Sequence, residues 1–183
     1  MKNDTKIFQK EKKTFSVKLN KDFDGIINFL SKQSNGQIEN YINVTASSNI
    51  KDCPPINSIL YDDKKEFKTK DIKNSWICFD FKDRRIIPSD YEIKSYSCSE
   101  FYDHPKSWII ECSNNKNDWI TVDEQKDCNY LNGKNIVHTF AMNKANNNEY
   151  RYIRMRLTGN NWRNCNDLKL DSFEIYGKLI VKM

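Results

Sequence analysis

The sequence predicts an all-β protein, an eight-stranded antiparallel jelly-roll β-sandwich with one short N-terminal helix. Two observations support this prediction. From Tyr41 onward, short apolar stretches alternate with period two and are separated by polar turns, which is typical of strands with one buried face. Before that point, only Asp24–Ser31 spaces its apolar residues at helical intervals, so a single short helix is expected.

The elements are expected in the following order. Residues 1–13 are charged and are interpreted as a tail, and a single domain is predicted over residues 14–180. The domain begins with a strand at Thr14–Leu19 and the helix at Asp24–Ser31, for which Asp24 is the candidate N-cap. Further strands are expected at Val44–Ser48, Trp76–Phe81, Tyr91–Tyr96, Ser107–Ser113, Trp119–Val122, Val137–Met142, Tyr150–Leu157 and Phe173–Tyr176.

The alternation also predicts which side chains form the core. In Tyr150–Leu157, for example, Arg154 and Arg156 are expected to face outward while the residues between them face inward. The core is predicted to include Phe79, Phe81, Ile93, Trp108, Ile110, Ile153, Met155 and Ile175.

Charge and composition exclude several classes of protein. The net charge of +5 comes from 24 Lys and only 6 Arg, with 23 Asn, a balance that favours a solvated surface over a nucleic-acid interface. No stretch is apolar enough for a membrane span, and the N-terminus lacks the apolar segment of a signal peptide. A cytoplasmic protein is therefore expected, with all six cysteines as free thiols.

Several segments together resemble a known family. WICFDF, SWIIECSNNKNDW, EYRYIRMRLTG and FEIYG, in this order within residues 43–177, resemble the discoidin domain, also called the coagulation-factor five/eight type C domain, which is galactose-binding-like. The resemblance is strongest to the intracellular members found with BTB domains in unicellular eukaryotes. Secreted members often carry a terminal disulfide, but here no cysteine lies near either end, and no BTB domain is present.

The resemblance implies that a ligand binds at loops on one end of the sandwich, here Asn49–Pro54, Ser97–Lys106 and Gly159–Asp167. An aromatic ring beside amide, imidazole and guanidinium groups suits a sugar. The alternative is that Trp162 packs beneath its own loop while the other side chains are solvated. Insertion into lipid is not expected, because these loops are mostly polar. The predicted ligand-binding residues are Asn49, Asp52, Tyr102, His104, Lys106, Asn161, Trp162 and Arg163.

No cofactor is certain, but the resemblance implies one candidate metal site, for a structural calcium ion. Asp62 and Asp63 lie where sugar-binding relatives often hold calcium, and Glu174 matches a carboxylate near the last strand that can contribute. Calcium prefers six to eight oxygen ligands. The adjacent Lys64 and Lys65 oppose a bound cation, so the alternative is a solvated acidic turn.

No catalytic motif occurs, and neither His104 nor His138 lies in a nucleophile motif. The sequence therefore predicts a non-enzymatic recognition module that binds a glycan or protein ligand through the loop end. Two alternatives stay open. The first is a partner-recruiting domain of a BTB-type ubiquitin-ligase adaptor, and the second is binding to an anionic surface through lysines. The sequence leaves the ligand and the oligomeric state undecided.

Overall fold

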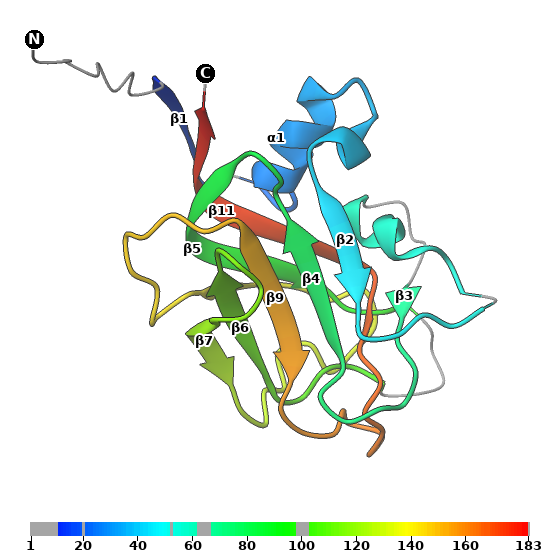
Figure 1. The fold of residues 1–183 in the computed structure, drawn as a ribbon. Coiled ribbons are helices and arrows are strands. Elements are labelled where there is room, and N and C mark those ends of the chain that lie inside the picture. The colour runs from blue at the N-terminus through cyan, green and yellow to red at the C-terminus, as the bar shows by residue number, and fades with distance from the viewer. Residues whose placement is uncertain (1–10, 20, 52, 62–66, 98–102, 183) are drawn as a thin grey trace, which may run out of the picture.

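The computed structural model describes residues 11–19, 21–51, 53–61, 67–97 and 103–182. In this part of the chain, two antiparallel sheets form a sandwich, with one α-helix beside it (Figure 1). The four-stranded sheet has the order β1 (Lys12–Val17), β11 (Ser172–Lys182), β5 (Arg85–Lys94), β8 (Val137–Ala141). The five-stranded sheet has the order β2 (Asn43–Ala46), β4 (Trp76–Asp80), β9 (Tyr152–Leu157), β6 (Trp108–Ser113), β7 (Ile120–Gln125).

The core lies between the two sheets and is rich in aromatic rings. Phe79 stacks on Phe173 with ring centroids 5.0 Å apart, and Tyr91 stacks on Phe140 at 5.1 Å. The eight residues predicted for the core are all fully buried: Phe79, Phe81, Ile93, Trp108, Ile110, Ile153, Met155 and Ile175. Their burial confirms the predicted phase of the strands and the all-β sandwich.

More strands are present than the predicted eight. The described residues contain eleven strands: the two large sheets hold nine, and a third sheet joins β3 (Phe67–Lys68) to β10 (Lys169–Leu170). Two-residue strands are too short to show any period in the sequence. Strand pairing also extends beyond the predicted domain boundaries, since Lys12 pairs with Lys182.

The alternation predicted that the last strand ends at Tyr176, before Gly177, but the strand is longer. Instead β11 runs on to Lys182, and its register against β5 shifts between Tyr176 and Gly177. This β-bulge needs glycine, because Gly177 has φ +135° and a Cβ there would clash with the carbonyl oxygen of Ile87. The extra residue at the bulge is Ser89 of β5, and β11 continues past Gly177.

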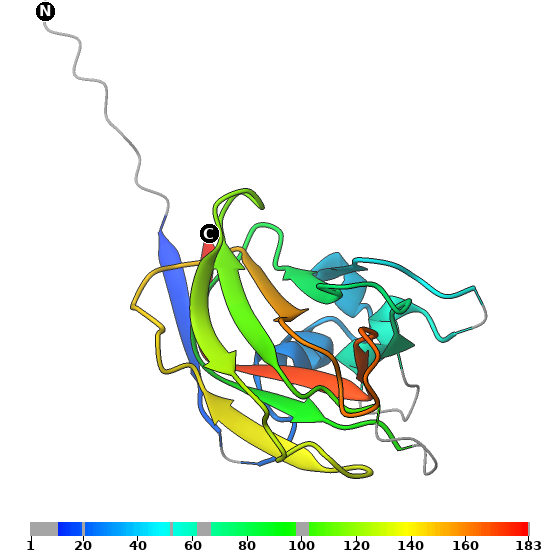
Figure 2. The same cartoon turned by 90° about the horizontal axis from the view of Figure 1, so that it is seen from below.

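The helix α1 (Ile26–Gln33) packs beside β11, as Figure 2 shows from below. The predicted N-cap Asp24 is wrong, because the cap residue is Gly25 and no side chain of its own segment caps the helix. Asp24 instead accepts hydrogen bonds from the side chains of Asn28 and Lys32. Two short 3-10 helices, η1 (Ile38–Asn40) and η2 (Ile56–Leu60), complete the described helical structure.

Within the described residues, no helix has the length and apolar character needed to cross a membrane. The five cysteines in this part of the chain are free thiols: Cys53, Cys78, Cys112, Cys128 and Cys165.

Candidate functional site

A cleft of about 670 Å³ is lined by residues of two of the three predicted ligand loops, Asn49–Pro54 and Gly159–Asp167. Three segments build it: the chain after β2, the chain at and after β3, and the loop between β9 and β10. These segments are far apart in sequence, and the β3–β10 pairing brings the second and third together. The described residues that line the cleft are Asn49, Ile50, Lys51, Lys68, Lys70, Asp71, Arg163, Cys165 and Asp167.

Asn161 organises the loop between β9 and β10. Its Oδ1 accepts hydrogen bonds from the backbone N–H groups of Arg163 and Cys165, each at 3.0 Å. Its Nδ2 donates to Oδ1 of Asp167 at 2.9 Å. With only 1% of its surface exposed, Asn161 shapes the loop from inside and is not presented to a ligand.

Asp71 joins this loop to the turn after β3. Its Oδ1 accepts hydrogen bonds from Asn166, from the backbone N–H at 2.6 Å and from the side-chain amide at 2.9 Å. These hydrogen bonds, the backbone one above all, lower the pKa of Asp71. The carboxylate therefore stays ionised at neutral pH while it holds two walls of the cleft together.

An ion pair joins two residues that line the cleft, Lys68 and Asp167. Lys68 Nζ lies 3.1 Å from Oδ2 of the buried Asp167. Burial alone would lower the pKa of Lys68, but the hydrogen bond and charge of Asp167 raise it overall. Lys68 and Asp167 are thus both charged and largely neutralise each other.

A second ion-pair group lies behind Arg163. The buried Asp103 is paired with the buried Lys169, with 2.9 Å between Nζ and Oδ2. The Arg163 guanidinium reaches the other oxygen of Asp103 at 3.5 Å. Burial would raise the pKa of Asp103, but Lys169, Arg163 and Lys68 lower it overall. Asp103 therefore helps to hold Arg163, a half-exposed side chain, at the cleft.

The structure brings only part of the predicted ligand set to the cleft. Asn49 and Arg163 line it, and Asn49 is exposed. His104 is 1% exposed, and burial lowers its pKa, so its imidazole is a neutral interior group. Its carbonyl oxygen accepts a hydrogen bond from the backbone of Trp162 at 3.2 Å.

Trp162 and Lys106 lie together, outside the cleft lining. The indole of Trp162 is half-buried and donates a hydrogen bond from Nε1 to the carbonyl oxygen of Cys128 at 3.3 Å. Lys106 Nζ covers the ring at 4.9 Å from its centroid and pairs with Asp127 at 3.0 Å. Trp162 thus contacts neighbouring segments, whereas the alternative had it packing beneath its own loop.

Asp52 and Tyr102, the remaining predicted ligand residues, lie outside the described residues, as do the candidate calcium ligands Asp62 and Asp63. Sequence reasoning missed Lys68, Lys70 and Asp71. The two-residue strand that positions them has no sequence signal, and only its pairing with β10 places them at the cleft.

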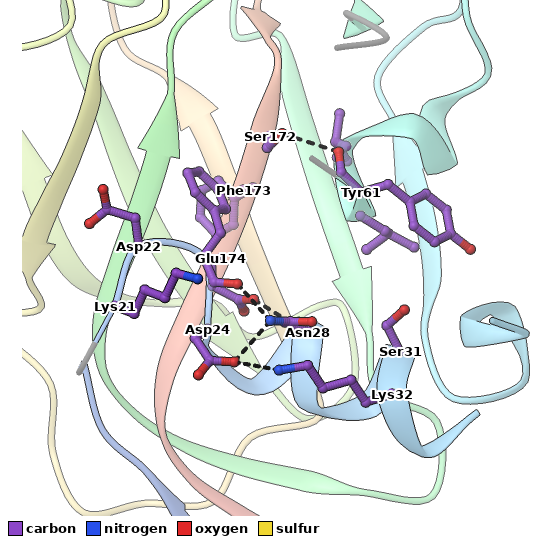
Figure 3. A pocket seen from close by; sticks show the side chains of 13 residues that line it. Lys21, Asp22, Asp24, Asn28, Ser31, Lys32, Tyr61, Ser172, Phe173 and Glu174 are labelled. Carbon is purple, nitrogen blue, oxygen red and sulfur yellow. Dashed lines mark hydrogen bonds and ion pairs between the residues drawn. The ribbon is translucent and has the colours of Figure 1, made fainter. Parts of the chain in front are cut away.

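Glu174 has a different role from the predicted one. Figure 3 shows its carboxylate directed at the start of α1, where Oε1 accepts the N–H of Ile27 at 2.8 Å and Oε2 that of Asn28 at 2.9 Å. Oε1 also accepts the N–H of Ile175 at 2.7 Å. Both oxygens therefore cap the helix from β11, which argues against Glu174 as a calcium ligand. Among the described residues, no group of three or more His, Cys, Asp and Glu side chains could hold a metal ion.

Figure 3 shows a second pocket, separate from the cleft: a cavity of about 470 Å³ between α1 and β11. Its walls mix acidic and basic side chains, among them Asp24, Lys32 and Glu174. Each of these three already takes part in the hydrogen bonds that hold α1. This cavity therefore belongs to the anchoring of the helix.

No model of a protein family and no curated protein sequence matches the chain. Solved structures match its fold. The module CBM32-5 of Clostridium perfringens, solved in complex with GalNAc-β-1,3-galactose, superposes with a TM-score of 0.57 at 10% identity, over 74% of this chain and 95% of that chain. A chitosan-binding module from a chitosanase/glucanase of Paenibacillus sp. IK-5 gives a TM-score of 0.58 at 16% identity, over 74% of this chain and 94% of that one.

A third match is the fucolectin from the serum of the striped bass, Morone saxatilis, with a TM-score of 0.58 at 14% identity, over 75% of this chain and 45% of that one. The chain has the discoidin-type, galactose-binding-like fold. This confirms the fold that the resemblance implied. The association with BTB domains stays a prediction.

Chemically, the cleft offers amide, ammonium, guanidinium and carboxylate groups. Among its described lining residues there is no aromatic ring and no histidine. His138, the second histidine, stacks on Tyr130 with ring centroids 4.3 Å apart and also lies outside the lining. The described groups can therefore bind a polar ligand through hydrogen bonds and charge.

Proposed function

We propose that this chain is a non-catalytic module that binds a glycan in the cleft lined by Asn49, Lys70 and Arg163. The observation that carries the proposal is the polar cleft itself, at the end of a sandwich whose fold is shared with carbohydrate-binding modules and a lectin. Hydroxyl groups of a sugar both donate and accept hydrogen bonds, so mixed amide, cationic and carboxylate walls suit them.

The absence of catalytic machinery is part of this proposal. The described cleft offers Asp71 and Asp167 as its carboxylates, and both are engaged, by Asn166 and by Lys68 with Asn161. A general acid or base needs a carboxylate that can exchange a proton with the substrate. These two are held as structural anions, so binding without turnover is expected.

The test is a glycan array followed by titration of each sugar that binds. Arg163→Ala and Asn49→Ala should each weaken binding by about 1–3 kcal/mol, the range of a modest hot spot. Both residues are exposed, so circular dichroism and the unfolding midpoint should stay close to those of the parent.

Two further variants complete the design. Asn143→Ala, an exposed asparagine in the segment after β8 and outside the cleft lining, should leave binding unchanged. Trp162→Ala asks whether the other face of the same loop contributes. If no glycan binds and a protein is captured with Arg163-dependent affinity instead, the partner-recruiting alternative would replace this proposal.

A further inference from the structure

We infer that the cleft prefers glycans that carry a negative group, a carboxylate or a sulfate ester, over their neutral counterparts. This inference rests on the proposed glycan-binding function and names the class of glycan. Its basis is the charge of the cleft and the way in which the acidic side chains there are already used.

Cationic side chains outnumber carboxylates in the cleft. Its described lining contains four cationic residues, Lys51, Lys68, Lys70 and Arg163, and two acidic ones, Asp71 and Asp167. The described walls therefore carry an excess of two positive charges. A concave surface with charges of one sign concentrates the field and attracts ligands of the opposite sign.

Neither carboxylate is placed to offset Lys51 or Lys70. Asp167 lies 3.1 Å from Lys68 and accepts from Asn161, and Asp71 accepts two hydrogen bonds from Asn166. Lys51 and Lys70 are both exposed, and no ion pair joins either to a carboxylate within the described residues. Both side chains line the cleft, where their ammonium groups can meet a bound anion.

Behind the cleft, a buried ion pair leaves this balance unchanged. Asp103 pairs with Lys169 at 2.9 Å, and Arg163, already counted in the lining, lies 3.5 Å from the other oxygen of the same carboxylate. A guanidinium also presents paired N–H groups that match the two oxygens of a carboxylate or sulfate.

The lining favours charge over ring stacking as the means of recognition. The described walls hold no aromatic ring, and Trp162, in the same loop, packs on Cys128 beneath Lys106. A neutral sugar would gain only hydrogen bonds and contact with Ile50 there. An acidic sugar adds ion pairs with groups that are already in place.

The test compares sugars that differ only in the charged group. Binding of the full chain is measured by NMR titration for D-galactose against D-galacturonate, D-glucose against D-glucuronate, and D-galactose against galactose 6-sulfate. We expect at least one acidic sugar to bind about tenfold more tightly than its neutral partner at low salt, and this preference should shrink as NaCl is raised.

Two lysine variants test whether the preference for acidic sugars comes from the cleft. Lys70→Gln should reduce binding of the acidic sugar roughly threefold, the effect of one exposed ion pair, with little change for the neutral one. The backbone N–H of Lys70 donates to Ser48, and this contact survives the substitution. Lys178→Gln removes the same charge from an exposed position on β11 and should leave both affinities unchanged.

Three outcomes would overturn the inference. In the first, neutral and acidic partners bind equally, in which case glycan binding stands and only the preference is wrong. In the second, Lys178→Gln and Lys70→Gln have equal effects, so the attraction comes from net charge. In the third, inorganic sulfate binds as tightly as the acidic sugars, so the cleft recognises an anion alone. Failure of the proposed function differs from all three, because no sugar of either kind would then bind.

Discussion

At the scale of single residues, Trp108 shows how one side chain connects the two sheets. It lies on β6, and its Nε1 donates a hydrogen bond at 2.9 Å to the hydroxyl of Tyr91 on β5 in the opposite sheet. That hydroxyl donates in turn to Asp123 at 2.7 Å. The indole also packs edge-on against Phe140, with ring centroids 5.4 Å apart.

We predict that Trp108→Ala lowers the free energy of unfolding by about 3–5 kcal/mol, as for other large aromatic deletions in cores. The side chain is 0% exposed, and its loss also leaves Tyr91 without a donor. Urea denaturation measures the change. Trp119→Ala is the matched control, because Trp119 is half-buried and stacks on Arg154. Equal losses in the two variants would contradict the prediction.

At the scale of secondary-structure elements, α1 is held by a carboxylate from another element. Glu174 on β11 receives the first N–H groups of the helix, and the cross-strand partner of Glu174 is Glu92. Glu92 is also buried and accepts from Phe23, Thr139 and Tyr176. Because helix N-termini favour negative charge, the arrangement offsets part of the cost of burying Glu174.

Burial nevertheless raises the pKa of Glu174 from 4.5 to about 7, against the lowering effect of the backbone N–H groups. A raised pKa in the folded state means that the folded protein binds the proton more tightly than the unfolded chain does. The contribution of Glu174 to stability is therefore complete below pH 4.5 and is lost as pH rises through about 7. The loss amounts to at most about 3 kcal/mol.

We predict that Glu174→Gln removes this part of the pH dependence. Unfolding midpoints at pH 5 and pH 8 provide the measurement, and the parent should lose more stability between them than the variant. The other charged side chains around this cavity, Lys21, Asp22, Asp24 and Lys32, are unchanged in both proteins. The same slope in parent and variant would show that Glu174 is not the group that titrates.

At the scale of the whole molecule, the first and last strands, β1 and β11, are neighbours on one side of the four-stranded sheet. Strand β1 pairs along its length with the far half of β11, from Lys12 opposite Lys182 to Val17 opposite Gly177, and Figure 1 shows β1 beside the end of β11. Phe15 of β1 packs on Phe29 of the helix, with ring centroids 5.3 Å apart.

We predict that a chain lacking residues 1–17 is less stable than the parent by more than about 2 kcal/mol, because backbone hydrogen bonds are lost and apolar side chains of β11 are exposed. A chain lacking only residues 1–10 keeps β1 and serves as the control, with an unfolding midpoint close to that of the parent. Thermal unfolding of the three chains checks this. Equal midpoints for all three would mean that β1 is dispensable.

The sequence by itself determined the all-β class and the core. Alternation is a local property, because successive side chains of a strand point to opposite faces, so residues such as Phe79, Trp108 and Ile153 could be assigned to the interior without knowledge of their partners. The sequence also predicted a ligand site at the loop end; Asn49 and Arg163 line the cleft, and their role in binding stays a prediction.

Only the tertiary structure decided the rest, because it depends on contacts between distant segments. The pairing of β3 with β10 places Lys68, Lys70 and Asp71 beside the loop that follows β9. Glu174 caps a helix that lies 146 residues away from it in sequence, at Asn28. Asn161 and His104 carry the polar groups of ligand-binding residues, yet their loops fold around them and bury them. The spacing of apolar residues along a strand shows which face of the sheet each side chain occupies. The contacts of a loop side chain depend instead on how distant segments pack.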